Sequence, residues 1–207
     1  MQKSRKPQSS PPHQVRIIGG QWKRTLLPVP DVEGLRPTPD RVRETLFNWL
    51  NHLLDGDWSR VNCLDLFAGT GALGFEAASR GAASVVMAEA NPAAVRQLDA
   101  IKHKLAAQQI KVLRGDALSV AQNLASDARF QLIFLDPPYR QDWLAKMLPL
   151  CKRLLTEDAL VYAEAEMPLD SQNAPAWLEG WNIVRADKAG LVFFHLLQRK
   201  IDSEFQA

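Results

Sequence analysis

Residues 61–81 read VNCLDLFAGTGALGFEAASRG, and this stretch decides the fold. Residues 61–66 form a short apolar run, for which we predict a buried strand. The FAGTG sequence at 67–71 follows at once, and its two glycines permit a tight turn. A helix is predicted to extend to about residue 80, because Gly81 is typical of the position just beyond a helix C-terminus. The stretch therefore predicts a strand, a glycine-rich turn and a helix in direct succession.

The same alternation of strand and helix continues along the chain. Short apolar runs predict further strands, and apolar residues at helical spacing predict helices between them. The strands are expected at 84–88, 110–113, 132–135 and 159–163, and the helices at 92–107, 117–124 and 142–155. Residues 181–188 and 191–198 flank Ala189-Gly190 and predict a closing hairpin. The pattern predicts an α/β fold, with a mainly parallel seven-stranded sheet, right-handed crossovers and a C-terminal antiparallel hairpin.

An acidic residue stands at the end of each of four successive parallel strands. These residues are Asp65, Glu89, Asp116 and Asp136. Ligands of open parallel sheets bind at the carboxyl ends of the strands. One such acid could be solvated surface charge, but four in series after apolar runs indicate a binding site at this edge.

The last of these acids opens the turn Asp136-Pro137-Pro138-Tyr139. Two consecutive prolines cannot continue a sheet ladder, so the chain is fixed into a stiff turn at the strand end. The turn presents a carboxylate, backbone carbonyls and one aromatic ring, which suit a flat substrate that carries an amino group. A tight turn with a solvent-facing aspartate is the structural alternative.

Residues 69–74, GTGALG, match the dinucleotide motif G-x-G-x-x-G, and Glu89 lies twenty positions after Gly69. Asp65 argues against NAD, because a carboxylate beside the glycine turn would repel a pyrophosphate. A nucleoside with a positive charge fits better, with Glu89 on the ribose, Asp116 toward the adenine amine and Asp65 toward an ammonium group. The pattern therefore favours S-adenosylmethionine as cofactor, and a nicotinamide-dependent oxidoreductase remains as an alternative.

The composition, 46% hydrophobic and 23% charged, is that of a globular protein. No apolar run approaches the roughly 20 residues that span a bilayer, and residues 1–14 lack the apolar core of a secretory signal. We therefore expect a cytoplasmic protein without membrane contact. Cys63 and Cys151 fit buried free thiols, and neither they nor the four histidines show metal-ligand spacing.

The N-terminal region carries the basic charge. Six Lys and Arg residues and no acid precede Asp31, which indicates a polyanionic partner. Residues 1–14 are predicted to be a disordered basic tail. Residues 15–18 and 21–26 predict two strands around Gly19-Gly20, in an extension that spans 15–37.

A helix is predicted from Thr38-Pro39-Asp40 to residue 53, with the Thr38 hydroxyl as its cap and proline at its first position. Arg36, Arg41 and Arg43 lie at or near its start and are expected on its exposed side, either as solvated surface charge or as substrate contacts. Together with the hairpin they give the candidate nucleic-acid-binding set, which is Arg16, Trp22, Lys23, Arg24, Arg36, Arg41 and Arg43.

These motifs resemble a known family. The sequences DLFAGTG at 65–71 and DPPY at 136–139, with Glu89 and Asp116, are similar to class I methyltransferases that act on exocyclic amines of bases. The sequences RIIGG at 16–20, LRPT at 35–38 and RVRETLFN at 41–48 narrow the resemblance to the RsmD family, the methyltransferases of guanine 966 N2 in bacterial 16S rRNA. The resemblance covers residues 15 to 198, and residues 1–14 lie outside it.

The resemblance implies a Rossmann-like methyltransferase domain over 38–207 that transfers a methyl group to a guanine N2. It implies a catalytic set of Asp136, Pro137, Pro138 and Tyr139, and a cofactor set of Asp65, Phe67, Ala68, Gly69, Thr70, Gly71, Glu89, Asp116 and Ala117. The expected partner is 16S rRNA, within a small ribosomal subunit or its assembly intermediate, and we expect a monomer. The same turn would serve an adenine N6 or cytosine N4 methyltransferase on DNA or RNA. A non-enzymatic RNA-binding protein is the remaining alternative.

Overall fold

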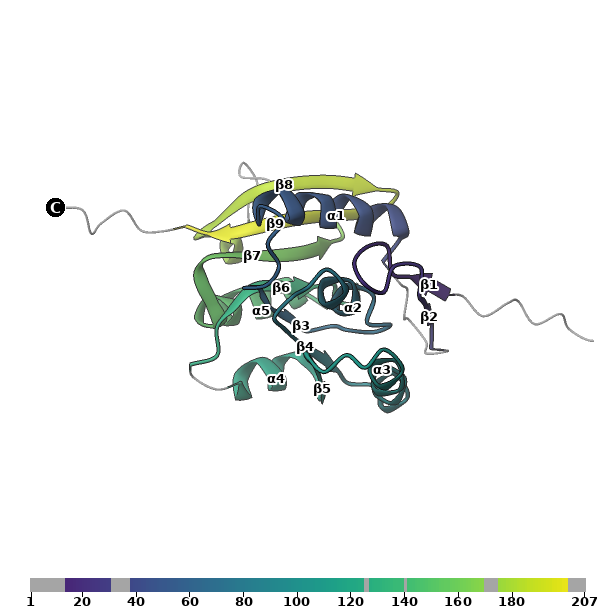
Figure 1. Cartoon of the computed structure of the whole chain (residues 1–207). Helices are drawn as coiled ribbons and strands as arrows, with labels where there is room; N and C mark the ends of the chain where they lie inside the picture. Colours follow the sequence, from purple (N-terminus) through teal and green to yellow (C-terminus); the bar gives the residue numbers. More distant parts are fainter. Residues whose placement is uncertain (1–13, 31–37, 125–126, 140, 170–174, 201–207) are drawn as a thin grey trace, which may run out of the picture.

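The computed structural model describes residues 14–30, 38–124, 127–139, 141–169 and 175–200. They form one seven-stranded sheet, a two-stranded sheet at the N-terminus, and helices on both faces of the larger sheet (Figure 1). The expected positions of Arg36, of the LRPT sequence in part, and of the basic tail through residue 13 lie outside the described residues.

The large sheet has the order β5-β4-β3-β6-β7-β9-β8. Its strands are β3 (Asn62–Asp65), β4 (Ser84–Glu89), β5 (Ile110–Arg114), β6 (Phe130–Leu135), β7 (Leu155–Ala165), β8 (Trp181–Ala189) and β9 (Val192–Arg199). The first five run parallel to one another, whereas β9 pairs antiparallel with both β7 and β8. The predicted α/β fold with a C-terminal antiparallel hairpin is therefore confirmed.

Successive residues of the central strands point into two separate cores, as the alternation of side chains along a strand requires. Cys63, Leu132 and Phe134 belong to one core, and Leu64 and Ile133 belong to the other. The first core is covered by α1 (Asp40–Leu53), α2 (Ala72–Ser79) and α3 (Pro92–Lys104), and the second by α4 (Ala117–Asn123) and α5 (Trp143–Leu154). A 3-10 helix, η1 (Ala176–Leu178), precedes β8.

The N-terminal hairpin forms, but with shorter strands than predicted. Residues of β1 (Gln14–Arg16) pair with β2 (Leu26–Pro28), and residues 21–24 are a turn. The prediction of a strand over 21–26 was therefore wrong. The reason is that the first residues of this segment bond to α2: the backbone N–H of Gln21 donates to the carbonyl of Ser79 at 2.8 Å, and the Trp22 N–H donates to the Ser79 hydroxyl at 2.9 Å.

A buried carboxylate on α2 holds the segment between the two short strands. Glu76 is fully buried and accepts hydrogen bonds from the backbone N–H groups of Ile18 and Gly19, at 2.6 and 2.8 Å. Gly20 follows with a φ of 74°, and a side chain there would collide with the backbone carbonyl of Ser79. The RIIGG sequence therefore serves to seat the hairpin against α2, beside α3 (Figure 1).

Both cysteines are buried free thiols, as predicted. None of the helices in the described part of the chain is long and apolar enough to cross a membrane.

Candidate active site

The four strand-end acids lie along one edge of the sheet. Their strands are adjacent in the order β5-β4-β3-β6, and parallel pairing brings all four carboxyl ends to the same side. The chain leaves β3 toward β4 on one side and returns to β6 on the other, so this edge is the point where strand order reverses. Such points are where open α/β sheets bind ligands.

Asp65 is the most buried of these acids. It is 1% exposed, and its Oδ1 accepts a long hydrogen bond of 3.3 Å from the Phe67 N–H. Among the residues that the structure describes, its Oδ2 has no hydrogen-bond partner. Burial raises the pKa of Asp65 to about 7, and the nearby charges of Asp136 and Glu89 act in the same direction. A buried carboxylate in this state is suited to a ligand that brings a cationic N–H donor.

Glu89 and the glycine turn hold each other in place. The Gly69 N–H donates to Oε2 of Glu89 at 2.9 Å, and the Asn91 N–H donates to Oε1 at 2.7 Å. Gly71 has a φ of 78°, and a β-carbon there would lie 2.6 Å from side-chain atoms of Leu98 and Phe75. The turn is therefore restricted to glycine at this point, and the half-buried Glu89 keeps lone pairs free for a further donor.

The other residues of the expected cofactor set lie around this turn. Ala68 is buried and its N–H donates to the Ala88 carbonyl at 3.0 Å, while Thr70 is buried and accepts from the Ala72 N–H at 3.3 Å. Phe67 is half-buried and packs edge-on against Trp143, with ring centroids 5.3 Å apart.

Asp116 lies farther along the edge and is exposed. It caps α4 by accepting from the Ser119 N–H at 2.9 Å, and the hydrogen bonds from Ser119 lower its pKa. Ala117 follows it and is buried in the second core. A pocket of about 270 Å³ lies beside them, between the end of β5 and α4.

The proline turn lies next to Asp65 across the β3–β6 pair. Asp136 is half-buried, Pro137 is buried, Pro138 is exposed and Tyr139 is 41% exposed. The Thr38 hydroxyl donates to Oδ2 of Asp136 at 2.7 Å. The prediction that this hydroxyl caps α1 was wrong: Pro39 is the N-cap residue, and no side chain caps the helix.

A fifth acid, Glu164, reaches the same edge and is absent from the expected set. It is 4% exposed and lies near the end of β7, next to the strand that carries Asp136. It follows the apolar run at 159–163, so the strand-end rule that selected the other four acids would have found it.

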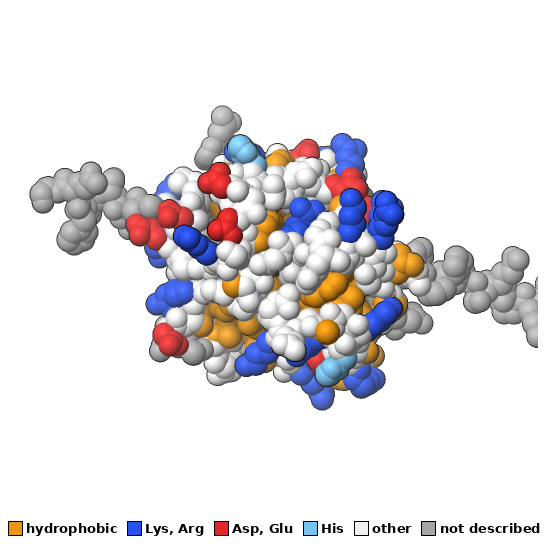
Figure 2. Space-filling view, in the orientation of Figure 1, with side chains coloured by type: hydrophobic (Ala, Val, Ile, Leu, Met, Phe, Trp, Pro, Cys, Tyr) orange, Lys and Arg blue, Asp and Glu red, His pale blue; other side chains and the backbone are white. Residues whose placement is uncertain are grey.

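The candidate RNA-binding residues do not share one environment. Lys23, Arg24 and Arg41 are exposed, and Arg16 is exposed while it pairs with Asp40 at 3.0 Å. Trp22 is half-buried against the first core. Figure 2 shows Lys and Arg side chains in several separate groups on this face, one of them where β1 meets the start of α1.

Arg43 corrects the prediction that it lies on the exposed side of α1. It is fully buried and donates to the carbonyls of Thr38 and Arg16, at 3.2 and 2.8 Å, and to Asp40 at 2.6 Å. These bonds occupy the guanidinium inside the protein, so Arg43 cannot hold a phosphate in this conformation.

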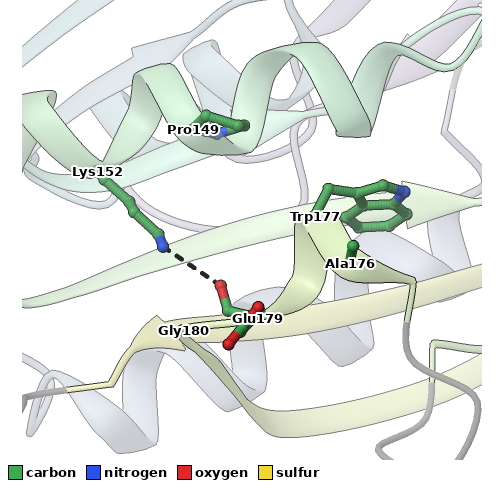
Figure 3. A pocket seen from close by; sticks show the side chains of 6 residues that line it. All are labelled: Pro149, Lys152, Ala176, Trp177, Glu179 and Gly180. Atoms are coloured by element: carbon green, nitrogen blue, oxygen red, sulfur yellow. Dashed lines mark hydrogen bonds between the residues drawn. The ribbon is translucent and has the colours of Figure 1, made fainter.

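A larger pocket of about 400 Å³ lies elsewhere, between α5 and η1 (Figure 3). The pairing of β8 and β9 places it toward the amino ends of the parallel strands, away from the acids. There Lys152 donates to the Glu179 carbonyl at 3.2 Å. None of the strand-end acids lines it. No group of three or more potential metal ligands occurs among the described residues.

Comparison with known proteins agrees with this arrangement. The family model described as "Conserved hypothetical protein 95" matches residues 15–198. The chain is 40% identical to ribosomal RNA small subunit methyltransferase D of Escherichia coli K12, over 98% of this chain and 99% of that protein. It is 37% identical to the Haemophilus influenzae protein of the same name, over 89% and 94% of the two chains.

Solved structures give the same result. The Escherichia coli protein yhhF has a TM-score of 0.75 and 38% identity, and the similarity covers 91% of this chain and 99% of that one. A Thermus protein, TTHA0928, has a TM-score of 0.71 and 28% identity, over 89% and 99%. The chain therefore belongs to the family described as conserved hypothetical protein 95, the RsmD family that its N-terminal motifs indicated.

Proposed function

We propose that this protein transfers the methyl group of S-adenosylmethionine to the exocyclic N2 of one guanine in 16S rRNA, at the position of guanine 966. The observation that supports the proposal is the juxtaposition of two carboxylates at one sheet edge: buried Asp65, whose Oδ2 has no hydrogen-bond partner among the described residues, and half-buried Asp136 in the proline turn on the neighbouring strand. Relatives that are 37–40% identical over nearly their whole length are named as small-subunit rRNA methyltransferases.

The acids fit the cofactor. Oδ2 of Asp65 is suited to the ammonium group, Glu89 to the ribose hydroxyls, and exposed Asp116 to the adenine amine. The backbone of residues 67–71 and Ala117 would complete the binding surface. An acid at Asp65 opposes the pyrophosphate of NAD. Bound at this edge, S-adenosylmethionine supplies a methyl group activated by the sulfonium charge.

The proline turn would hold the guanine. Asp136 and the carbonyl of Pro137 can accept the two N–H groups of the amine, which leaves its lone pair directed away from them. Positioning of this kind is worth about 7–11 kcal/mol of barrier. Tyr139, exposed at the rim, would stack on the base after it leaves its own stack. The proton released by the methylated nitrogen can pass to Asp136 or to water.

Exposed cations of the N-terminal region would position the RNA. Lys23, Arg24 and Arg41 are exposed, as is Arg16 beside Asp40, and these cations would contact phosphates, which fix orientation without reading sequence. Arg36 remains a prediction outside the described residues. We further propose that the protein acts as a monomer in the cytoplasm, on the small subunit or its assembly intermediate.

The test uses small ribosomal subunits from cells that lack this protein. Incubation with the protein and labelled S-adenosylmethionine is expected to place one methyl group on guanine 966 N2, identified by mass mapping of nucleosides. A methyl group on an adenine N6 or a cytosine N4 would overturn the proposed base, and no transfer would overturn the proposed reaction.

Asp136→Ala is expected to reduce transfer by at least about 10²-fold while the affinity for S-adenosylmethionine changes little. Asp158→Ala is the matched control, because Asp158 is an exposed acid near the other end of β7. Retained turnover in the Asp136 variant would remove this carboxylate from the mechanism.

A further inference from the structure

The structure brings a second carboxylate to Asp136. Strands β6 and β7 run parallel, and Leu135 pairs with Ala163, so Asp136 and Glu164 each follow the last residue of this pair. This register places the two side chains on the same face of the sheet, and the pKa of each carboxyl group responds to a hydrogen bond with the other. Glu164 is buried, whereas Asp136 is half-buried at the rim of the site.

Tyr162 holds the other side of Glu164. Its hydroxyl donates to Oε1 of Glu164 at 2.6 Å, and both side chains are buried. The Tyr162 ring packs edge-on against Phe134, with centroids 6.2 Å apart, and this contact fixes the ring within the first core. Glu164 therefore lies between the Tyr162 hydroxyl and Asp136 and is only 4% exposed.

Asp136 and Glu164 share one proton, because two carboxyl groups in hydrogen-bond contact cannot both be ionised near neutral pH. Burial raises the pKa of Glu164 to about 9, and the charge of Asp136 adds to the effect. Burial also raises the pKa of Asp136, but hydrogen bonds from Thr38 and Glu164 oppose this rise. Glu164 is therefore the protonated member and donates, while Asp136 is the ionised member and accepts.

We propose that Glu164 is a positioning residue, whose protonated carboxyl group donates to Asp136 and, with the Thr38 hydroxyl, fixes the carboxylate that receives the substrate amine. The inference rests on the proposed function, since it concerns the group that holds the amine. Two donors from different parts of the chain act on this carboxylate: the Thr38 hydroxyl, which precedes α1, and the Glu164 carboxyl group in β7. A carboxylate fixed in this way needs no reorganisation when the amine arrives.

The test compares Glu164→Leu with Glu164→Gln on the small ribosomal subunits described above. Leucine removes the donor, and we expect kcat to fall about 10²-fold, with the KM for subunits and the Kd for S-adenosylmethionine within about twofold of the wild type. Glutamine keeps a neutral N–H donor and an oxygen that can accept from Tyr162. The kcat of Glu164→Gln should therefore exceed that of Glu164→Leu by at least about tenfold. If the side chain only filled space, the two variants would have similar kcat values.

The inference is overturned if Glu164→Leu keeps a kcat within about threefold of the wild type, or if Glu164→Gln is no better than Glu164→Leu. If the leucine variant fails to fold, the double variant Glu164→Leu with Tyr162→Phe removes both buried partners together. The double variant should show the same low kcat, and wild-type turnover by it would also refute the inference. A wild-type protein that leaves the subunits unmethylated would instead contradict the proposed function itself.

Discussion

Replacement of Arg43 by methionine tests whether this residue stabilises the fold or binds RNA. Methionine has nearly the same length but no donors, so the change removes three hydrogen bonds from a fully buried position. Two of the acceptors are backbone carbonyls, of Thr38 and Arg16, and the third is Asp40 at the start of α1. The change therefore disconnects the N-terminal hairpin from the first turn of the helix.

The magnitude follows from the loss of these partners. The carbonyls of Thr38 and Arg16 lose their donor, at about 1–3 kcal/mol each, whereas Asp40 loses less because it is 40% exposed and keeps its pair with Arg16, so the unfolding free energy should fall by about 3–5 kcal/mol. For a domain of this size each kcal/mol lowers Tm by about 2–4 °C, so the expected decrease is about 6–20 °C. Thr38 also loses its anchor, and with it the hydrogen bond that it donates to Asp136, so kcat should decrease as well.

Thermal unfolding by calorimetry and RNA binding at several salt concentrations separate the two roles. Arg41→Met is the matched control, because Arg41 is an exposed residue of the same helix. It should change the unfolding free energy by less than about 0.5 kcal/mol. It should also reduce the salt slope of RNA binding, the slope of the logarithm of the binding constant against the logarithm of the salt concentration, by about one. The reasoning is refuted if Arg43→Met keeps the wild-type Tm but lowers the salt slope.

Three further predictions concern the other parts of the site. The raised pKa of Asp65 lies at about 7, and only the ionised carboxylate pairs with an ammonium group, so the Kd for S-adenosylmethionine, measured by calorimetry, should fall about tenfold per pH unit as the pH rises to 7. In the Asp65→Asn variant the Kd should not change over this pH range. Gly20→Ala should cost more unfolding free energy in denaturant than Gly190→Ala, since both have positive φ but only Gly20 faces a backbone carbonyl; equal costs would exclude the close approach. Replacing Lys23 and Arg24 together by glutamine should lower the salt slope of RNA binding by about two, and an unchanged slope would mean that these exposed cations do not contact phosphate.

Local patterns in the sequence were enough to predict the fold. The spacing of apolar residues fixes which segments are strands and helices, and a strand–helix–strand unit closes in only one hand. For the same reason the strand-end acids could be assigned to one edge before any distance was known. The failed prediction at residues 21–26 shows the limit, because the backbone N–H groups of Gln21 and Trp22 bond to a helix more than 50 residues away.

The environment of the charged groups depended on the tertiary structure. The sequence shows Arg43 as one cation among several, and its burial depends on the carbonyls of Thr38 and Arg16 and on Asp40, which folding brings around it. Thr38 is separated by 98 positions from the carboxylate to which it donates.

The sequence by itself therefore determined the sheet, the glycine turn and the proline turn, because each depends on neighbours along the chain. Only the tertiary structure decided the protonation and partners of the acids, because desolvation and hydrogen bonding depend on residues that folding brings together. Burial raises the pKa of Asp65, and the two donors to Asp136 are Thr38, which precedes α1, and Glu164 in β7.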